Sequence, residues 1–326
     1  MTAEDPRSEP AAPGGPGLAP RNWAPEQLVP AGLAAELIGR QFPRLAGAPV
    51  EPLATGWDNT VYVVAGQWVF RFPRRAMALP GIEREIEVLP RIAAHLPLPI
   101  PVPEFVGAPC DQYPWPFWGG RLLRGGELAE SGLADDSRGD AAAAVGRFLR
   151  ALHDPGLVDE AGARQLPVDP MGRADAGKRA HMSREVLSRL ADLGAWKPRT
   201  AAERLIRDAE LLGPPDGTPA LAHGDLHIRH LLVDRDGQAC GVIDWGDVCL
   251  ADPAIDLSIA YGAFDGPARA ALLAAYGPVS AESEIRARIL ALFLCAVLAE
   301  YAAAENRPHL LREALTGLNR AVAGHS

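Results

Sequence analysis

The stretch from Leu221 to Asp256 holds several aspartates and three histidines between short apolar runs. Ionisable groups are seldom this dense in a protein core, because a charge buried without a partner is strongly destabilising. We therefore expect this stretch to carry the chemistry of the protein.

The spacing of apolar and turn-forming residues predicts how this stretch folds. Asp225 follows a short apolar lead, and the apolar run from Leu231 to Val233 ends in residues 234–237, which have the composition of a two-residue hairpin turn. A second apolar run, Cys240 to Ile243, returns from the turn. The predicted order is therefore loop, strand, tight turn, strand and loop.

This hairpin is expected to bring three polar residues together. Antiparallel pairing places the entry of the first strand beside the exit of the second, so Asp225 and Asp244 should face each other with His230 near both. Mg²⁺ binds a few protein oxygens and keeps its other positions for water and phosphate. Two carboxylates and one further ligand therefore suit one or two Mg²⁺ ions.

Two other interpretations of these residues stay open. Asp225 and the three histidines, His230 among them, could form a zinc site, because imidazole and carboxylate are zinc ligands. His223 and His227 have the i, i+4 spacing of one helical face, although Gly224 and the apolar run after it favour a loop and a strand. In a purely structural role, His223 would be hydrogen-bonded and Asp225 would cap a turn.

Three motifs together resemble the aminoglycoside phosphotransferase family, which consists of small-molecule kinases with the protein-kinase fold. They are H-G-D-L-H-I-R-H-L-L-V from His223, I-D-W-G-D from Ile243 and D-P-A-I-D-L from Asp252, and the resemblance extends over about residues 50 to 320. It implies an α+β, protein-kinase-like two-lobed fold, with a small antiparallel-sheet N-terminal lobe and a larger helical C-terminal lobe. It also implies transfer of the γ-phosphoryl group of ATP or GTP to a hydroxyl of a small molecule, with Mg²⁺ as cofactor.

The resemblance gives individual residues a role. Asp225 matches the catalytic base, and Asp244 matches the metal-binding Asp of the kinase D-F-G motif. His230 stands where kinases have a metal-binding Asn, and the sequence is similar here to the macrolide phosphotransferases of the family, which also have His. Asp256 matches the aspartate that anchors the backbone of the catalytic loop, so its expected role is structural.

Arg71 lies in the segment from Trp68 to Phe72, whose alternation predicts a strand with Arg71 opposite to the two phenylalanines. In kinases, a Lys on this strand contacts the nucleotide phosphates and pairs with a Glu on the next helix. The resemblance assigns this role to Arg71, with Glu85 as its partner and Glu83 as a second possibility. The run W-V-F-R-F-P-R-R is again similar to macrolide phosphotransferases, and Arg can bind phosphate through two parallel hydrogen bonds. A surface Arg on an edge strand and a solvated helix acid are the alternatives.

The segment from Gly56 to Asn59 links the first two predicted strands. The resemblance places the phosphate-covering hairpin loop there, which would make Gly56 and Asn59 nucleotide-binding residues. A single glycine does not by itself indicate a phosphate loop, since such loops are glycine-rich.

The remaining pattern predicts the elements that position these residues. Three strands between Val50 and Phe72, with two more in residues 102–106 and 117–123, should form the small sheet, and residues 119–126 should form the hinge that binds the nucleotide base. Apolar residues at helical spacing predict a helix from Ile82 to Ala94. Further helices are predicted over residues 30–42, 145–152, 172–213 with a break near 196–198, 267–276, 282–301 and 308–322.

The composition limits the class of protein. A chain of 326 residues that is 48% hydrophobic can form one two-lobed domain. The net charge of −9 argues against nucleic acid as a partner. The four cysteines contain no C-x-x-C pair, which favours reduced thiols and a cytoplasmic location.

Residues 1–22 are rich in Pro, Ala and Gly without apolar periodicity, so we expect a disordered tail there. We expect an N-terminal nucleotide-binding lobe over residues 23–123 and a C-terminal catalytic and substrate-binding lobe over residues 124–326. The tail lacks the basic start and apolar core of a signal peptide. The longest apolar run, Ile289 to Val297, is well short of the roughly 20 residues of a membrane span. It predicts a buried helix and no membrane association.

The acceptor is the feature that the sequence constrains least. The segments expected to line its site, residues 172–200 and 256–305, mix acids with alanines, leucines and aromatics, without the dense acidic cluster that a polycation requires. We expect a bulky, weakly charged, hydroxylated acceptor, macrolide-like or another antibiotic-like natural product, with GTP or ATP as donor. The alternatives are an aminoglycoside kinase, a metabolic kinase for a sugar or amino alcohol, a catalytically inactive kinase-like nucleotide-binding protein and a metal-dependent hydrolase.

Overall fold

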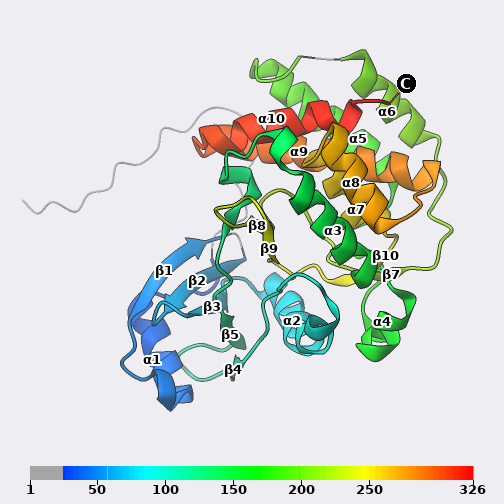
Figure 1. Cartoon of the computed structure of the whole chain (residues 1–326). Coiled ribbons are helices and arrows are strands. Elements are labelled where there is room, and N and C mark those ends of the chain that lie inside the picture. Colours follow the sequence, from blue (N-terminus) through cyan, green and yellow to red (C-terminus); the bar gives the residue numbers. More distant parts are fainter. Residues whose placement is uncertain (1–24, 57, 198, 326) are drawn as a thin grey trace, which may run out of the picture.

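The computed structural model describes residues 25–56, 58–197 and 199–325. The tail expected over residues 1–22 lies outside this part of the chain. The described chain folds into a small lobe built on a sheet and a larger lobe of helices, which confirms the two-lobed α+β fold (Figure 1).

The small lobe is built on a five-stranded antiparallel sheet in the order β1-β2-β3-β5-β4. Its strands are β1 (Val50–Thr55), β2 (Asn59–Val64), β3 (Trp68–Pro73), β4 (Phe105–Gly107) and β5 (Phe117–Arg121). The first three agree with the prediction, whereas β4 and β5 are shorter than predicted. β4 begins only after Pro103, because the prolines before it have no N–H group to donate to a neighbouring strand.

Among its described residues, this lobe has two α-helices, α1 (Ala31–Gln41) and α2 (Leu79–Ile92). α1 packs on the sheet face that carries the buried rings of Phe70 and Phe72. The alternation of β3 therefore turns Arg71 to the opposite face, as predicted. α2 starts earlier than predicted, with a proline in its first turn. A backbone N–H group in the first turn of a helix has no intrahelical acceptor, so proline costs no hydrogen bond there.

The predicted hairpin of the large lobe forms, but its turn is longer than expected. It lies in a three-stranded sheet of β6 (Gly126–Glu127), β8 (Leu231–Val233) and β9 (Ala239–Val242), in that order. The prediction of a two-residue turn is wrong, because the N–H group of Asp234 donates to the carbonyl of Gln238 at 2.9 Å and leaves a three-residue loop between them. Gly237 ends that loop, the position where hairpins of this length favour glycine.

The rest of the large lobe is mainly helical, with one further antiparallel pair, β7 (Ala220–Ala222) and β10 (Cys249–Ala251). Its helices are α3 (Gly139–Leu152), α4 (Pro155–Glu160), α5 (Ala176–Asp192), α6 (Thr200–Glu210), α7 (Ala254–Gly262), α8 (Gly266–Tyr276), α9 (Ala281–Ala304) and α10 (Pro308–Val322). α7 was absent from the predicted elements. All of its residues are buried, so its sequence has no polar face to reveal a helical period.

α9 is a central helix of the large lobe. It has 24 residues and contains the apolar run from Ile289 to Val297, so the predicted helix forms and extends well beyond the run. By length and composition α9 could cross a membrane, and the expectation that this stretch is too short for a span is therefore wrong. However, 67% of its apolar window is buried inside the molecule, where α9 packs against α5, α7 and α10. This is the position of a core helix.

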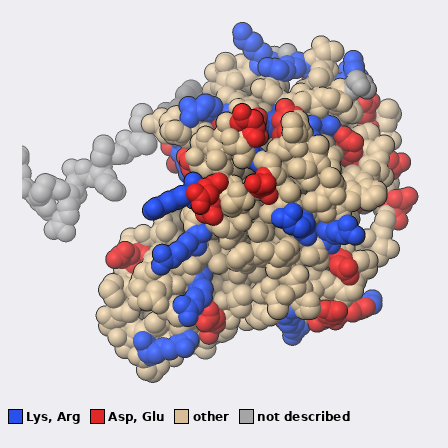
Figure 2. Space-filling model, in the orientation of Figure 1, with Lys and Arg blue, Asp and Glu red and all other residues tan. Residues whose placement is uncertain are grey.

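Acidic and basic side chains are interspersed over both lobes on the face shown in Figure 2. The acidic residues therefore do not form one large negative patch on that face. A broad basic stripe of the kind that nucleic acids require is not visible there either.

Candidate active site

A buried carboxylate anchors the catalytic loop, which we define as residues 223–230. Asp256, in the first turn of α7, accepts the backbone N–H groups of His223 at 2.7 Å and Gly224 at 3.0 Å. His153 Nε2 lies 3.2 Å from the same carboxylate. Asp256 is fully buried, and a hydrogen bond to such a charged group contributes about 1.5–3 kcal/mol. It holds the position of the anchoring aspartate expected from the sequence.

Gly224 lets the catalytic loop pack directly on residues 243–248, the segment after β9. Its φ is +90°, and a Cβ atom at this position would lie 2.2 Å from the carbonyl oxygen of Asp247. Only glycine fits such a close approach of two backbones. This contact brings the loop that carries Asp225 against the segment that carries Asp244.

His230 lies between these two aspartates, as the hairpin predicts. Its Nδ1 donates to the backbone carbonyl of Asp225 at 2.7 Å, and its Nε2 lies 3.3 Å from Asp244 Oδ2. A carbonyl oxygen can only accept, so Nδ1 carries a proton and the lone pair of the neutral ring is on Nε2. Burial opposes protonation, but the hydrogen bond and the charge of Asp244 outweigh it and raise the pKa of His230.

His223 has both ring nitrogens engaged. Its Nε2 donates to the carbonyl of Ile243 at 2.9 Å, and its Nδ1 accepts the N–H group of Asp225 at 3.2 Å. Complete burial lowers the pKa of His223 to about 4, so the ring is neutral. His223 is therefore a structural residue, and the zinc interpretation loses one of its histidines.

His227 stacks on His230, with their ring centroids 3.9 Å apart. Its Nδ1 accepts the N–H group of Arg229 at 3.2 Å, so Nε2 carries the proton of the neutral ring. Possible ligand atoms of Asp225, His227 and His230 lie within 4.8 Å of one another, but a protonated nitrogen cannot bind a metal ion. In this arrangement His230 alone of the three histidines has the tautomer of a metal ligand.

Asp225 exposes 23% of its side chain. Its Oδ1 accepts a hydrogen bond from Arg173 Nη2 at 2.9 Å, while Oδ2 lies 3.8 Å from His227 Nε2 and 4.0 Å from His230 Nδ1. Burial raises the pKa of Asp225, and the charge of Arg173 opposes that rise. A carboxylate with a raised pKa is a stronger base than a free one, which suits the role predicted for Asp225.

Arg71 connects the small lobe to this site. Its Nη1 donates to Glu85 at 2.8 Å and its Nη2 to Asp244 at 2.7 Å. Glu85, fully buried on α2, also accepts Trp118 Nε1 at 2.9 Å, whereas Glu83 is exposed. Because β3 is an internal strand, Arg71 is not the edge-strand surface residue that the alternative interpretation required. Burial favours the neutral guanidine, but the charges of Glu85 and Asp244 outweigh it and raise the pKa of Arg71.

Gly56 and Asn59 close the turn between β1 and β2. The N–H group of Gly56 donates to the carbonyl of Asn59 at 2.9 Å, and Arg74 Nη1 donates to the carbonyl of Gly56 at 2.7 Å. Val61 is the cross-strand partner of Arg71, so alternation along β2 puts Asn59 on the same sheet face as Arg71. Gly56 and Asn59 are thus near β3, the strand that carries Arg71.

The segment after β9 also binds α2 through contacts that the sequence did not reveal. Arg84 Nη2 donates to the carbonyl of Gly246 at 2.7 Å. A Cβ atom at Gly81 would lie 2.8 Å from that same oxygen. Because charged residues on amphipathic helices usually face water, nothing in the sequence distinguished Arg84 from its neighbours.

Arg173 is a further residue of the site that sequence reasoning missed. It precedes α5 and contacts Asp225 across a sequence separation of 52 residues. The surrounding sequence carries no motif, so the contact emerges only from the way the loop before α5 packs on the hairpin.

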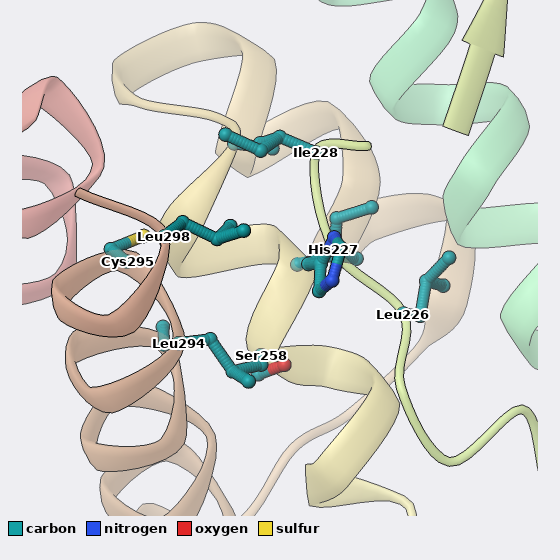
Figure 3. A pocket seen from close by; sticks show the side chains of 11 residues that line it. Leu226, His227, Ile228, Ser258, Leu294, Cys295 and Leu298 are labelled. Atoms are coloured by element: carbon teal, nitrogen blue, oxygen red, sulfur yellow. The ribbon is translucent and has the colours of Figure 1, made fainter. Parts of the chain in front are cut away.

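A small apolar pocket lies between the catalytic loop, α7 and α9 (Figure 3). His227 lines it together with Leu226 and Ile228 of the loop and with Cys295 and Leu298 of α9. Its volume of about 10 Å³ has room for roughly one water molecule. A bulky acceptor therefore cannot enter it.

A basic residue on β3 that pairs with a Glu on the next helix and lies near an aspartate beyond the hairpin of the large lobe is the arrangement of protein kinases, where the basic residue is Lys; here it is Arg71. Together with the two-lobed fold, it places the protein among the kinase-like phosphotransferases. Within that class, the sequence profile of the phosphotransferase enzyme family, APH, matches residues 49–288. The chain belongs to this family and is a phosphotransferase with an alcohol group as acceptor.

Solved structures of two kinds of antibiotic kinase share the fold. The GDP and kanamycin complex of APH(2″)-IIIa has a TM-score of 0.65 and 24% identity, over 90% of this chain and 99% of that one. The apoenzyme of the macrolide 2′-phosphotransferase MphH from Brachybacterium faecium has a TM-score of 0.56 and 21% identity, over 88% of this chain and 97% of that one. At these identities the likeness establishes the fold alone.

One curated sequence is similar over a shorter region. It is the uncharacterized protein YcbJ of Bacillus subtilis, which is 40% identical over 60 residues, or 18% of this chain. The chain spans about a fifth, 20%, of the length of that relative. This match therefore does not identify an acceptor.

Replacing Asp256 by Asn should weaken the anchor of the catalytic loop. The amide oxygen can accept one of the two N–H groups, but the amide nitrogen faces the other and leaves it unsatisfied. We expect the free energy of unfolding to fall by roughly 2–4 kcal/mol in urea denaturation. The control is Asp252→Asn, since Asp252 accepts the N–H group of Ala254 at 2.8 Å and Asn serves equally well there. Equal stability of the two variants would contradict the anchoring role.

Proposed function

We propose that the protein transfers the γ-phosphoryl group of GTP or ATP to a hydroxyl of a bulky, weakly charged, antibiotic-like natural product. One observation carries this proposal: Arg71 of the small lobe contacts Asp244, and Asp244 is joined through His230 to Asp225. In this proposal residues 23–123 bind the nucleotide, and residues 124–326 hold the catalytic and acceptor sites.

Asp225 is the catalytic base in this proposal. Its Oδ2 accepts the proton of the acceptor hydroxyl while the hydroxyl oxygen forms a bond to the γ-phosphorus and the bond to the β-phosphate oxygen breaks. The raised pKa of Asp225 supports this role, because burial makes its carboxylate a better proton acceptor. Positioned acid–base groups typically contribute about 10²- to 10⁴-fold in rate.

The donor atoms of Asp244 and His230 fit a divalent cation. Asp244 Oδ2 and His230 Nε2 lie 3.3 Å apart, and in the neutral ring, which keeps its proton on Nδ1, Nε2 can bind a metal ion that takes the place of the Nε2 proton. The side chain of Asp244 is 49% exposed, so a ligand can reach it. These two residues would hold Mg²⁺, which would neutralise charge on the phosphates of the donor.

Arg71 and the turn before β2 bind the phosphates of the donor in this proposal. Among the described residues, Arg71 Nε is a buried donor without a hydrogen-bond partner, whereas Asn59 Oδ1 is a buried acceptor without one. A buried donor left unpaired is unfavourable, so an oxygen of the triphosphate would satisfy the guanidinium. Glu85 keeps Arg71 oriented, and Gly56 shapes the turn over the phosphates, while the hinge over residues 119–126 binds the base.

The loop that carries Arg173 supports a weakly charged acceptor. It lies beside Asp225, and two of its apolar side chains are exposed, Val168 by 63% and Met171 by 51%. Apolar contacts of this kind suit a large hydroxylated ring system better than a polycation.

Asp225→Ala should lower kcat by two or more orders of magnitude, because the acceptor loses its base. Binding of GTP or ATP should be nearly unchanged, since Arg71 and Asp244 remain in place. Steady-state kinetics and calorimetric titration of nucleotide measure the two effects. Asp236→Ala, in the exposed hairpin turn, is the matched control and should keep full activity. Near-normal turnover of Asp225→Ala would rule out its role as base.

His230→Asn should keep activity within about tenfold, because an amide oxygen can replace the imidazole nitrogen as a metal ligand. His230→Leu offers no ligand and should lose at least about a hundredfold. Initial rates measured over a range of Mg²⁺ concentrations separate weaker metal binding from slower turnover. If the Asn variant is inactive at every Mg²⁺ concentration, His230 has another role.

The acceptor class can be tested with a panel of hydroxylated antibiotics and metabolites, by following nucleotide consumption and the phosphorylated product. We expect turnover with macrolide-like compounds, and a KM for the acceptor that changes little with added salt, because few charges are screened. Steep salt dependence would identify a polycationic acceptor such as an aminoglycoside. Nucleotide binding without any product would favour the inactive nucleotide-binding protein, and zinc in the purified protein would favour the hydrolase.

A further inference from the structure

One guanidinium nitrogen bridges two carboxylates beside the catalytic loop. Arg173 Nη2 lies 2.9 Å from Asp225 Oδ1 and 2.8 Å from Asp247 Oδ2. The side chain of Arg173 is only 12% exposed, so water screens these contacts weakly. A buried, charge-assisted contact of this kind fixes the orientation of the groups that it joins.

The backbone of Arg173 is fixed independently of its side chain. Asp169 accepts the N–H groups of Arg173 at 2.7 Å and Ala174 at 2.9 Å. Asp169 in turn donates its own N–H group to the carbonyl of Leu250 at 2.8 Å, and Leu250 donates to the carbonyl of Pro167 at 3.0 Å. The loop is thus tied to β10, the strand that follows Asp247 in the chain.

Two buried arginines hold the same loop from neighbouring helices. Arg179 of α5 donates to the carbonyls of Met171 and Gly172, at 2.5 Å and 3.0 Å. Arg286 of α9 donates to the carbonyl of Ala174 at 3.1 Å. Arg173 is therefore presented to Asp225 from a rigid support that involves β10, α5 and α9.

The contact determines which oxygen of Asp225 is available. Oδ1 is occupied by Arg173, whereas Oδ2 is directed toward the side of His227 and His230. Without the guanidinium, the carboxylate could rotate about its side-chain torsions and would lie near the negative charges of Asp244 and Asp247 without a bonded cation. Both changes would misplace the oxygen that has to accept a proton.

We propose that Arg173 is a positioning residue of the phosphoryl transfer: it holds Oδ1 of Asp225 so that Oδ2 faces the acceptor hydroxyl. This inference rests on the proposed role of Asp225 as base. Arg173 touches neither donor nor acceptor in this proposal, and it acts through Asp225 alone. Asp247 contacts the same guanidinium nitrogen and helps to hold it in place.

The test compares Arg173→Gln and Arg173→Lys in the full-length protein. A displacement of about 1 Å at a reacting group can lower the rate about a hundredfold, so we expect a loss of that order in kcat for Arg173→Gln, with the KM for nucleotide unchanged. Lys supplies a charge, but its ammonium nitrogen lies one bond short of the position of Nη2, so it should restore activity only in part. Arg184→Gln is the matched control, because Arg184 pairs with Glu210 on the exposed face of α5.

A structural role for Arg173 would give a different result. If Arg173 only fastens the loop, Arg173→Gln would lower the unfolding temperature and leave kcat per folded molecule near that of the wild type. Free guanidinium added to Arg173→Ala should restore part of the activity, because it can occupy the space beside Asp225. It should not restore Asp225→Ala. Unchanged kcat in Arg173→Gln, or equal rescue of both Ala variants, would overturn the proposal.

Failure of the proposed function can be told apart from failure of this inference. Absence of product from the wild-type protein with every acceptor contradicts the function itself. In that case a double-mutant cycle of Arg173→Gln and Asp225→Asn, followed by thermal unfolding, still tests the contact. Losses that are clearly not additive support the pairing, and additive losses overturn it.

Discussion

The contacts of Asp244 with Arg71 and His230 are the interaction on which the rest of the site depends. One carboxylate oxygen lies 2.7 Å from the guanidinium of the small lobe, and the other lies 3.3 Å from the imidazole of the large lobe. Asp244 has a φ of +66°, a left-handed conformation that costs a residue other than glycine about 1–2 kcal/mol. The two contacts offset this strain, and the strained backbone turns the carboxylate toward both lobes at once.

Backbone contacts then set how far the parts of the site can move. Gly224 lets the catalytic loop pack closely on Asp247, and Gly81 lets α2 pack closely on Gly246 of the same segment. Asp256 fixes the start of the catalytic loop because it accepts the backbone N–H groups of His223 and Gly224. The segment after β9 is therefore held between a helix of the small lobe and a loop of the large lobe, and its position determines that of Asp244.

The sequence predicted the parts of the site that depend on local pairing. Asp225, His230 and Asp244 meet because a hairpin joins the entry of one strand to the exit of the next, and Glu85 meets Arg71 because helical spacing puts it on the buried face of α2. Arg84 and Arg173 could not be predicted, since their contacts depend on how distant elements pack. The turn length also escaped prediction, because a composition of Asp and Gly favours a tight turn without fixing the number of residues in it.

In the proposed function, the ion pairs of Arg71 would also affect how the protein discriminates among anions. In the free protein, Glu85 and Asp244 already neutralise the charge of the guanidinium, so an anion that approaches its unpaired Nε is repelled by two carboxylates unless it displaces Asp244. A small anion such as inorganic phosphate would release Asp244 without giving it a new cation, and would gain little net free energy. A triphosphate that arrives with its own divalent cation supplies a new partner to both sides of the broken pair. If the protein binds a nucleotide as proposed, the same salt bridge that joins the lobes would therefore act as a filter against the simple anions that are abundant in any cell.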